Sequence, residues 1–202
     1  AELIAGNRCE RPLKKEQTSV DLPNAYLFKQ QLINNAKKQQ LQGDFPNGTV
    51  GMPLGLNVYE MYPFWMAFWN KLGYRVQLSP FGSRSLYAKG QHTIPSDTIC
   101  YPAKLIHGHI EYLLDKKPDF IFYPCLSYNF NEHLSDNHYN CPVVAYYPEL
   151  LKANVSALAD FDFMMPYFEL ADKKRFTKHA VKFFCGKYPQ IKKKQVIAAV
   201  ED

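Results

Sequence analysis

The sequence predicts a three-layer α/β domain built on a mostly parallel sheet. From Thr49 onward, short apolar runs alternate with amphipathic stretches, which is the pattern of βαβ units around such a sheet. In residues 59–72 the large apolar side chains also recur at helical spacing, between runs of strand length. A chain of 202 residues that is 47% hydrophobic can bury a full core. We expect a linker and helical extension over residues 1–48, followed by one α/β domain over residues 49–202.

The first half of the chain is expected to supply an N-terminal helix and the first βαβ unit. Residues 1–23 show no apolar period and are typical of a linker, whereas 24–41 has a helical pattern that ends before Gly43 and Pro46. The elements expected after them are a strand at 49–57, a helix at 59–72, a strand at 74–78 and a short helix at 83–89. The aromatic residues of the 59–72 helix are expected to belong to the core.

The second half is expected to complete the sheet. Pro102 is suited to the first turn of a helix, because its fixed φ fits there and its missing N–H would be unbonded. The elements expected are a helix at 101–114, strands at 119–123 and 142–147, a helix near 149–153, a possible fifth strand at 161–166, and helices at 173–188 and 190–200. The link from Cys125 to Cys141 exceeds the usual loop length, so it is either functional or a sign of one wrong strand assignment.

Three of the five cysteines, Cys100, Cys125 and Cys141, lie at expected element boundaries, each close to a proline. Cys100 precedes a helix, where unpaired N–H groups and the helix dipole stabilise a thiolate. Cys125 leaves a strand at its carboxyl end, where ligands gather in open α/β sheets. Cys141 precedes an expected strand, and a parallel strand there would place it at the opposite edge of the sheet. An odd number of cysteines without a secretion signal indicates free thiols or metal ligands rather than disulfides.

Several site chemistries are open to these cysteines. An iron–sulfur cluster needs three or four thiolates in one pocket, which Cys100, Cys125 and Cys141 could supply. Adding His138 gives four ligands of a type that zinc accepts. Unpaired cysteines are also often small buried residues without a ligand. His107 and His109 cannot share one ion, because two positions apart on a helix they point in nearly opposite directions. We expect His109 to pack in the core and His107 to meet solvent or a partner.

Other functions find little support in the composition. The net charge of +5 is modest and the lysines are scattered, so no nucleic-acid partner is expected. No apolar run approaches the ~20 residues of a membrane span and no secretory segment is visible, which favours a cytoplasmic protein. The chain has neither a dinucleotide-binding turn nor a Walker loop, and no local signature of a Cys-His hydrolase. Because it starts without Met, we expect a fragment of a longer polypeptide.

Four ordered motifs resemble a known family: LNVYEMYPFW at 56–65, CYPAKLIHGH at 100–109, FYPC at 122–125 and NHYNCP at 137–142. Together they are similar to the uncharacterised domain that follows the ATPase module in large CoA-enzyme activase proteins, relatives of the 2-hydroxyacyl-CoA dehydratase activators and reductases. The resemblance spans about residues 50–149. The segment GNRCER at 6–11 resembles the end of a cysteine-rich connector that precedes this domain, which would leave Cys9 an orphaned ligand.

The resemblance implies a Rossmann-like domain in a system of anaerobes where ATP hydrolysis drives an electron to very low potential through [4Fe–4S] clusters. By position, Cys100 and Cys125 match two cluster cysteines of dehydratase-like subunits, whose third ligand comes from a later domain; Cys141 is a candidate replacement. The implied partners are the ATPase module of the same polypeptide and a 2-hydroxyacyl-CoA dehydratase-like redox partner.

The leading hypothesis is therefore an iron–sulfur, electron-transfer domain without catalytic activity of its own, in which the sulfurs of Cys100 and Cys125 face one pocket. The alternative is a docking module whose cysteines are structural. Iron content after anaerobic reconstitution separates the two.

Overall fold

The computed structural model describes residues 22–39 and 43–201, and it forms a three-layer, Rossmann-like α/β fold. Its four-stranded parallel sheet has the order β2-β1-β3-β5. A second parallel pair, β4-β6, continues it, because β4 follows β3 and β6 follows β5 along the chain. The strands are β1 (Gly48–Met52), β2 (Tyr74–Leu78), β3 (Phe120–Phe122), β4 (Cys125–Leu126), β5 (Phe163–Met164) and β6 (Tyr167–Phe168). The helices are α1 (Ala25–Gln39), α2 (Asn57–Lys71), α3 (Arg84–Gly90), α4 (Tyr101–Lys116), α5 (Pro142–Asn154), α6 (Lys173–Lys187) and α7 (Lys193–Glu201).

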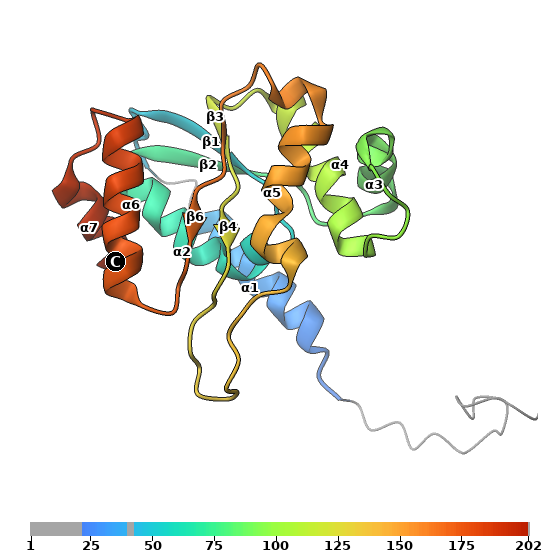
Figure 1. Ribbon diagram of the computed structural model, residues 1–202, viewed down its shortest axis with the longest axis horizontal. Helices are drawn as coiled ribbons and strands as arrows, with labels where there is room; N and C mark the ends of the chain where they lie inside the picture. The colour runs from blue at the N-terminus through green and yellow to red at the C-terminus, as the bar shows by residue number, and fades with distance from the viewer. Residues whose placement is uncertain (1–21, 40–42, 202) are drawn as a thin grey trace, which may run out of the picture.

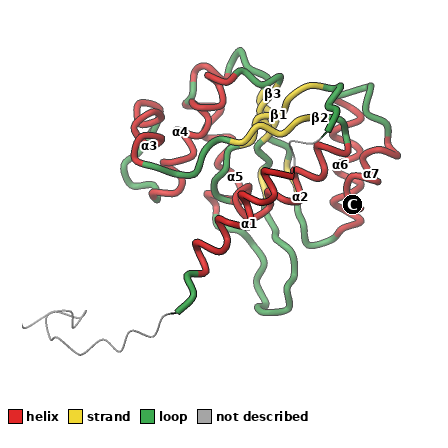
Figure 2. The backbone as a smooth tube through the Cα atoms, turned by 180° about the vertical axis from the view of Figure 1, so that it is seen from behind, coloured by secondary structure: helices red, strands yellow, loops and turns green. Residues whose placement is uncertain are grey.

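Helices cover both faces of the sheet, with α3, α4 and α5 on one side and α2, α6 and α7 on the other (Figure 1, and from behind in Figure 2). On the second side, Trp65 of α2 lies 4.7 Å from Phe122, and Trp69 lies 5.2 Å from Phe120, between ring centroids. Both tryptophans are fully buried, as are Tyr62 and Phe68, so the expectation that the aromatic residues of this helix form the core is confirmed for these four. Phe64 is only partly buried and packs against the edge of this core. None of the helices in the described part of the chain combines the length and apolarity needed to cross a membrane.

A continuous ladder joins β3-β4 to β5-β6 across two prolines. The N–H groups of residues 121, 123, 125 and 127 donate in turn to the carbonyls of Asp162, Met164, Pro166 and Phe168. Pro166 contributes no N–H to this ladder, which explains why the pairing divides into two short segments. The second proline, Pro124, lies beyond the end of β1. Its carbonyl accepts a hydrogen bond of 3.0 Å from the side-chain amide of Asn57. The strand that carries Cys125 therefore runs past β1 to the carboxyl edge of the sheet.

The backbones of α3 and α4 touch at two glycines. A Cβ atom on Gly108 would lie 1.9 Å from the carbonyl oxygen of Leu86, and one on Gly90 would lie 2.1 Å from the N atom of Gly108. Real Cβ contacts are never this short, so the approach of the two helices depends on glycine at both positions. This close packing fixes α4, and with it the residue before its first turn, Cys100.

The expected elements are found with one clear exception, the strand at 142–147. These residues form the first half of α5, and the fourth strand of the sheet is β5, inside the segment where a fifth strand was expected. Strand preferences are strong in Val143, Val144, Tyr146 and Tyr147, but Pro142 lies in the first turn of a helix, as Pro102 does in α4. The expected first strand is also too long, since β1 ends at Met52, before Pro53.

Candidate functional site: the cysteine edge

Cys100 and Cys141 occupy equivalent positions at the starts of two neighbouring helices. Cys100 is the N-cap of α4 with φ −63° and ψ 151°, and Cys141 is the N-cap of α5 with φ −60° and ψ 152°. The carbonyl of each accepts a helical hydrogen bond, from Lys104 at 3.1 Å and from Ala145 at 2.9 Å. Neither thiol caps its helix, and both residues are exposed. The positive ends of two helix dipoles thus carry free thiols on one side of the sheet.

Cys125 lies in the floor between these helices. It belongs to β4 and is 1% exposed. Because side chains alternate along a strand, Cys125 points to the same face as Tyr123, toward α4 and α5. Burial raises the pKa of the Cys125 thiol to about 12, and the Glu149 carboxylate adds to this effect. The thiol is therefore protonated at neutral pH.

Tyr123 occupies the centre of the site, fully buried, and among the described residues no hydrogen-bond partner meets its hydroxyl. Burial raises the pKa of Tyr123 well above its ordinary value, and charges on Cys125, Tyr147 and Cys141 would raise it further. These groups therefore lie within electrostatic reach of its hydroxyl. We call the set of Cys100, Tyr123, Cys125, Cys141 and Tyr147 the cysteine edge.

A hydrogen-bonded chain leads from the cysteine edge into α4. The Thr93 hydroxyl donates to the carbonyl of Gly90 at 2.9 Å, so it accepts from Nδ1–H of His107 at 2.8 Å. Nε2 of the neutral His107 ring must then accept from the Tyr147 hydroxyl, also at 2.8 Å. Burial, and secondarily the charge of His92, lowers the pKa of His107 to about 4, which keeps this ring neutral. Tyr147 in turn lies near Cys100, whose charge adds to the effect of burial in raising the pKa of Tyr147 to about 12.

Both histidines of α4 are buried, although this was expected only of His109. The expectation that His107 meets solvent or a partner is wrong, because it is fully buried against α5. Its spacing from Ala103 and Ile110 places it on the buried stripe of the helix, and this signal was present in the sequence. His109 packs in the core as expected, with Nδ1 2.7 Å from the Ser79 hydroxyl.

The cysteine edge has the donors of a cluster site without a closed ligand set. Within residues 22–39 and 43–201, no group of three or more His, Cys, Asp or Glu side chains is placed to hold a metal ion. This applies to the three cysteines and equally to a zinc set that adds His138. The donor chemistry fits an iron–sulfur cluster, whereas the geometry does not complete one and Cys125 is protonated. The assignment of Cys100, Cys125 and Cys141 as cluster ligands therefore remains a prediction; Cys9 lies outside the described residues.

A long loop, residues 127–140, joins Cys125 to Cys141 and projects from the domain (Figure 1). Its base is pinned by bonds from Asn140 N–H to Ser127 O and from Asn129 N–H to His138 O, both 2.9 Å. Tyr139 of the loop bonds its hydroxyl to that of Tyr146 on α5 at 2.8 Å. Four partly exposed tyrosines line this side of the molecule: Tyr128, Tyr139, Tyr146 and Tyr167.

Comparison with known proteins identifies the family of the chain. No curated protein and no solved structure shows a significant match. The family described as the CoA enzyme activase uncharacterised domain matches residues 49–202, which include the cysteine edge and all of the sheet except Gly48, the first residue of β1. The chain belongs to this family of CoA enzyme activase domains.

Proposed function

We propose that this domain supplies Cys100, Cys125 and Cys141 as thiolate ligands of a [4Fe–4S] cluster in ATP-coupled, low-potential electron transfer. The observation that carries the proposal is the start of α5 at Cys141. Because a helix and not a strand follows it, Cys141 lies on the same side as Cys100, above the strand that bears Cys125. When bound, such a cluster supplies one-electron chemistry at low potential.

The residues of the chain would prepare this edge for anionic sulfur. The uncapped N–H groups at the starts of α4 and α5 follow directly after Cys100 and Cys141, so the positive ends of both helix dipoles would favour anionic sulfur bound there. The buried hydroxyl of Tyr123 is a donor without a partner in the described structure, so it is available to sulfur. Cys125 must lose its proton on binding, which makes assembly dependent on pH.

The missing ligand is assigned to another part of the same polypeptide, and the partners to the ATPase module of that polypeptide and a 2-hydroxyacyl-CoA dehydratase-like redox protein. This setting is the cytoplasm of an anaerobe. A ligand set completed by a second domain agrees with two exposed thiols at an open edge.

Anaerobic reconstitution with iron and sulfide tests the proposal on this chain and on a longer polypeptide that includes its neighbouring domains. We expect iron and visible absorbance in the longer protein, and their loss in Cys100→Ser and Cys141→Ser. The matched control is Cys185→Ser, because this half-buried thiol lies on α6, away from the edge. If the longer protein binds no iron, or if all variants retain the same iron content, the cysteines are not cluster ligands.

A docking role is the second candidate, favoured by the lack of a closed ligand group and by the exposed tyrosines of the loop side. Tyrosine is enriched in the energetic centres of interfaces. In this case the double variant Tyr139→Ala and Tyr146→Ala would lose binding to the ATPase module in a pull-down, whereas the cysteine variants would keep it. Loss of iron without loss of binding would reject this candidate.

A further inference from the structure

An apolar pocket of about 630 Å³ lies on the far side of the domain from α3 and α4, between the 127–140 loop, α2, α6 and α7. It is lined by Phe64, Phe130, Asn131, His133, Leu170, Ala171, Lys173, Phe176 and Val200. Phe64 and Phe176 meet edge to face with ring centroids 5.8 Å apart, and Phe130 is 48% exposed at the loop side. Three phenylalanine rings therefore contribute to the walls, and one of them, that of Phe130, is about half exposed.

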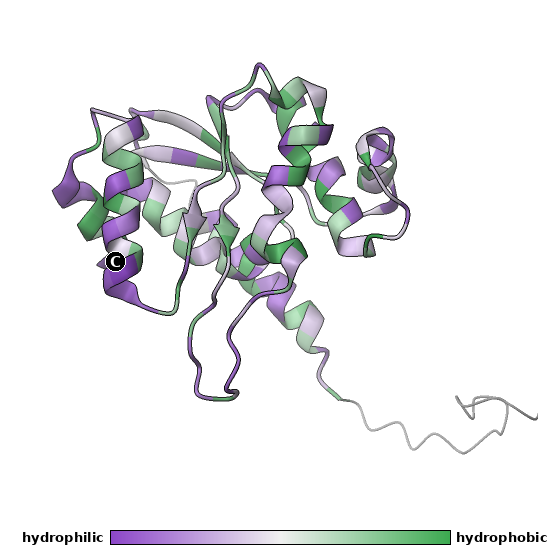
Figure 3. Cartoon of the chain, in the orientation of Figure 1, coloured by the Kyte–Doolittle hydropathy of each residue, from purple (hydrophilic) through white to green (hydrophobic). Residues whose placement is uncertain are grey.

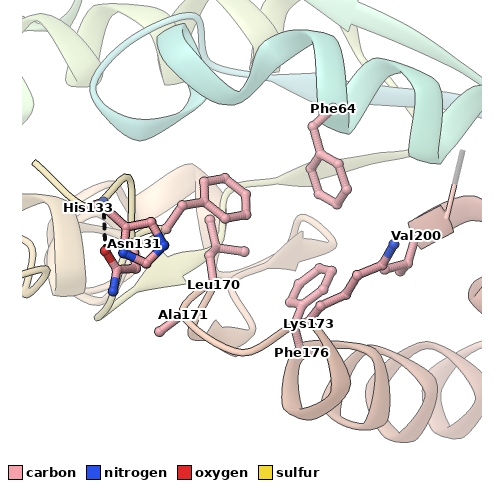
Figure 4. A pocket seen from close by; sticks show the side chains of 9 residues that line it. Phe64, Asn131, His133, Leu170, Ala171, Lys173, Phe176 and Val200 are labelled. Carbon is pink, nitrogen blue, oxygen red and sulfur yellow. Dashed lines mark hydrogen bonds between the residues drawn. The ribbon is translucent and has the colours of Figure 1, made fainter.

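Polar groups face this pocket from two sides. Figure 4 shows Asn131 and His133 of the loop at one end and Lys173 beside Val200 at the other, with Phe64 and Phe176 between them. Lys173 is the first residue of α6, and no carboxylate in the described part of the chain forms an ion pair with it. A free ammonium group at the rim of an aromatic pocket favours a ligand that carries negative charge.

A second groove of about 560 Å³ continues from Lys173 between α6 and α7. Four lysines line it, Lys173, Lys174, Lys178 and Lys193, against one carboxylate, Glu201. Asp172, the cap of α6, adds a second carboxylate at the start of this helix, and it accepts hydrogen bonds from the N–H groups of Lys174 and Arg175 at 2.7 and 3.1 Å. Figure 3 shows hydrophilic residues recurring along both helices, between hydrophobic ones. The aromatic pocket thus opens onto a groove of net positive charge.

We infer that the aromatic pocket and the adjoining groove lined by lysines form one binding site. Its ligand is a small aromatic anion, a molecule that joins a planar ring to a phosphate or carboxylate group. The ring lies among Phe64, Phe130 and Phe176, and the anionic group binds Lys173 and the adjoining lysines. Each groove has the size typical of a small-molecule site, and aromatic walls with a few polar groups are the usual lining. Aromatic stacking favours a planar ring, and charge-assisted bonds favour an oxyanion.

Titrations followed by ¹H–¹⁵N NMR test this inference on the intact chain with four probes. AMP and 3-phenylpropanoate each join a ring to an anion, whereas inorganic phosphate and benzyl alcohol carry the two parts separately. We expect one or both aromatic anions to bind at least about tenfold more tightly than either separate part, with shifts at Phe130 and Lys173. AMP alone would assign the phosphate class, and 3-phenylpropanoate alone the carboxylate class.

Two pairs of variants locate the binding. We expect Phe130→Ala and Lys173→Glu to weaken it by about tenfold or more, and Leu134→Ala and Lys152→Glu to leave it unchanged. Leu134 is 87% exposed on the same loop, and Lys152 is an exposed lysine of α5, so each control changes a similar side chain outside the two grooves. The inference is overturned if neither aromatic anion binds better than its parts, or if the controls weaken binding as much as the site variants do.

Discussion

Acid is expected to destabilise this domain through two histidines buried in the neutral form. Burial lowers the pKa values of His107 and His109 to about 4, below the ordinary value of about 6.5. At a pH between these two pKa values, the two histidines bind protons in the unfolded chain but not in the folded one. The stability that the neutral rings confer is therefore complete above pH 6.5 and is lost as the pH falls toward 4.

The size of this loss follows from the two pKa values. At pH 5 a histidine in the unfolded chain is almost fully protonated, whereas a buried one is almost neutral. Each ring therefore lowers the free energy of unfolding by about 2 kcal/mol relative to pH 8. Two such rings give about 4 kcal/mol if they act independently. Domains of this kind have total stabilities of about 5–15 kcal/mol, so the effect is large enough to measure.

Urea unfolding at pH 8, 7, 6 and 5 measures this loss of stability in four proteins: the wild type, His107→Gln, His109→Gln and the control His179→Gln. His179 lies on the exposed side of α6. Carboxylates also titrate in this range, but they contribute equally to all four proteins. We expect each buried-site variant to lose about 2 kcal/mol less than the wild type between pH 8 and pH 5. Equal losses in the wild type and in both buried-site variants would refute the reasoning.

Three further outcomes follow from contacts in the same region. Gly108→Ala is expected to lower stability by about 3 kcal/mol or more, because its Cβ would lie 1.9 Å from the Leu86 carbonyl oxygen and force α3 from α4; an unchanged melting temperature would contradict this. Tyr147→Phe leaves Nε2 of His107 buried without a donor and should cost about 1–3 kcal/mol in urea unfolding. The buried, protonated thiol of Cys125 should react with iodoacetamide at pH 8 much more slowly than the exposed thiols of the cysteine edge, as mass spectrometry would show.

Strand and helix signals compete at residues 142–147, and this explains the one misassigned strand. Local preference favours a strand there, since branched and aromatic residues are dense. The deciding features are Pro142 in the first turn and the burial of Ala145, Pro148 and Leu151, which follow one another at a spacing of three. Where the signals agreed, as in β2 and α2, the expected and observed elements nearly coincide.

The arrangement of the site depends on contacts that no local pattern contains. His107 and Tyr147 are 40 residues apart, and they meet because α4 and α5 lie side by side on one face of the sheet. The sequence places Cys100 before a helix and Cys125 after a strand, and both placements are close to the structure. It cannot place the sulfurs relative to one another, because their separation is set by the packing of α4 and α5 on that strand.

The 127–140 loop connects the two proposed sites physically. Its base is fixed beside the cysteine edge, where the Asn140 side-chain amide donates to the Leu126 carbonyl at 3.0 Å. It is also bonded to the segment that lines the aromatic pocket, from Leu170 N–H to Tyr128 O at 2.9 Å. A ligand that contacts Phe130 and His133 therefore acts on a segment whose ends lie next to Cys125 and Cys141. Such a ligand can shift the positions of these thiols only as far as it binds one loop arrangement more tightly than another. Comparing the iron content after reconstitution with and without the aromatic anion would test whether the ligand shifts these thiols.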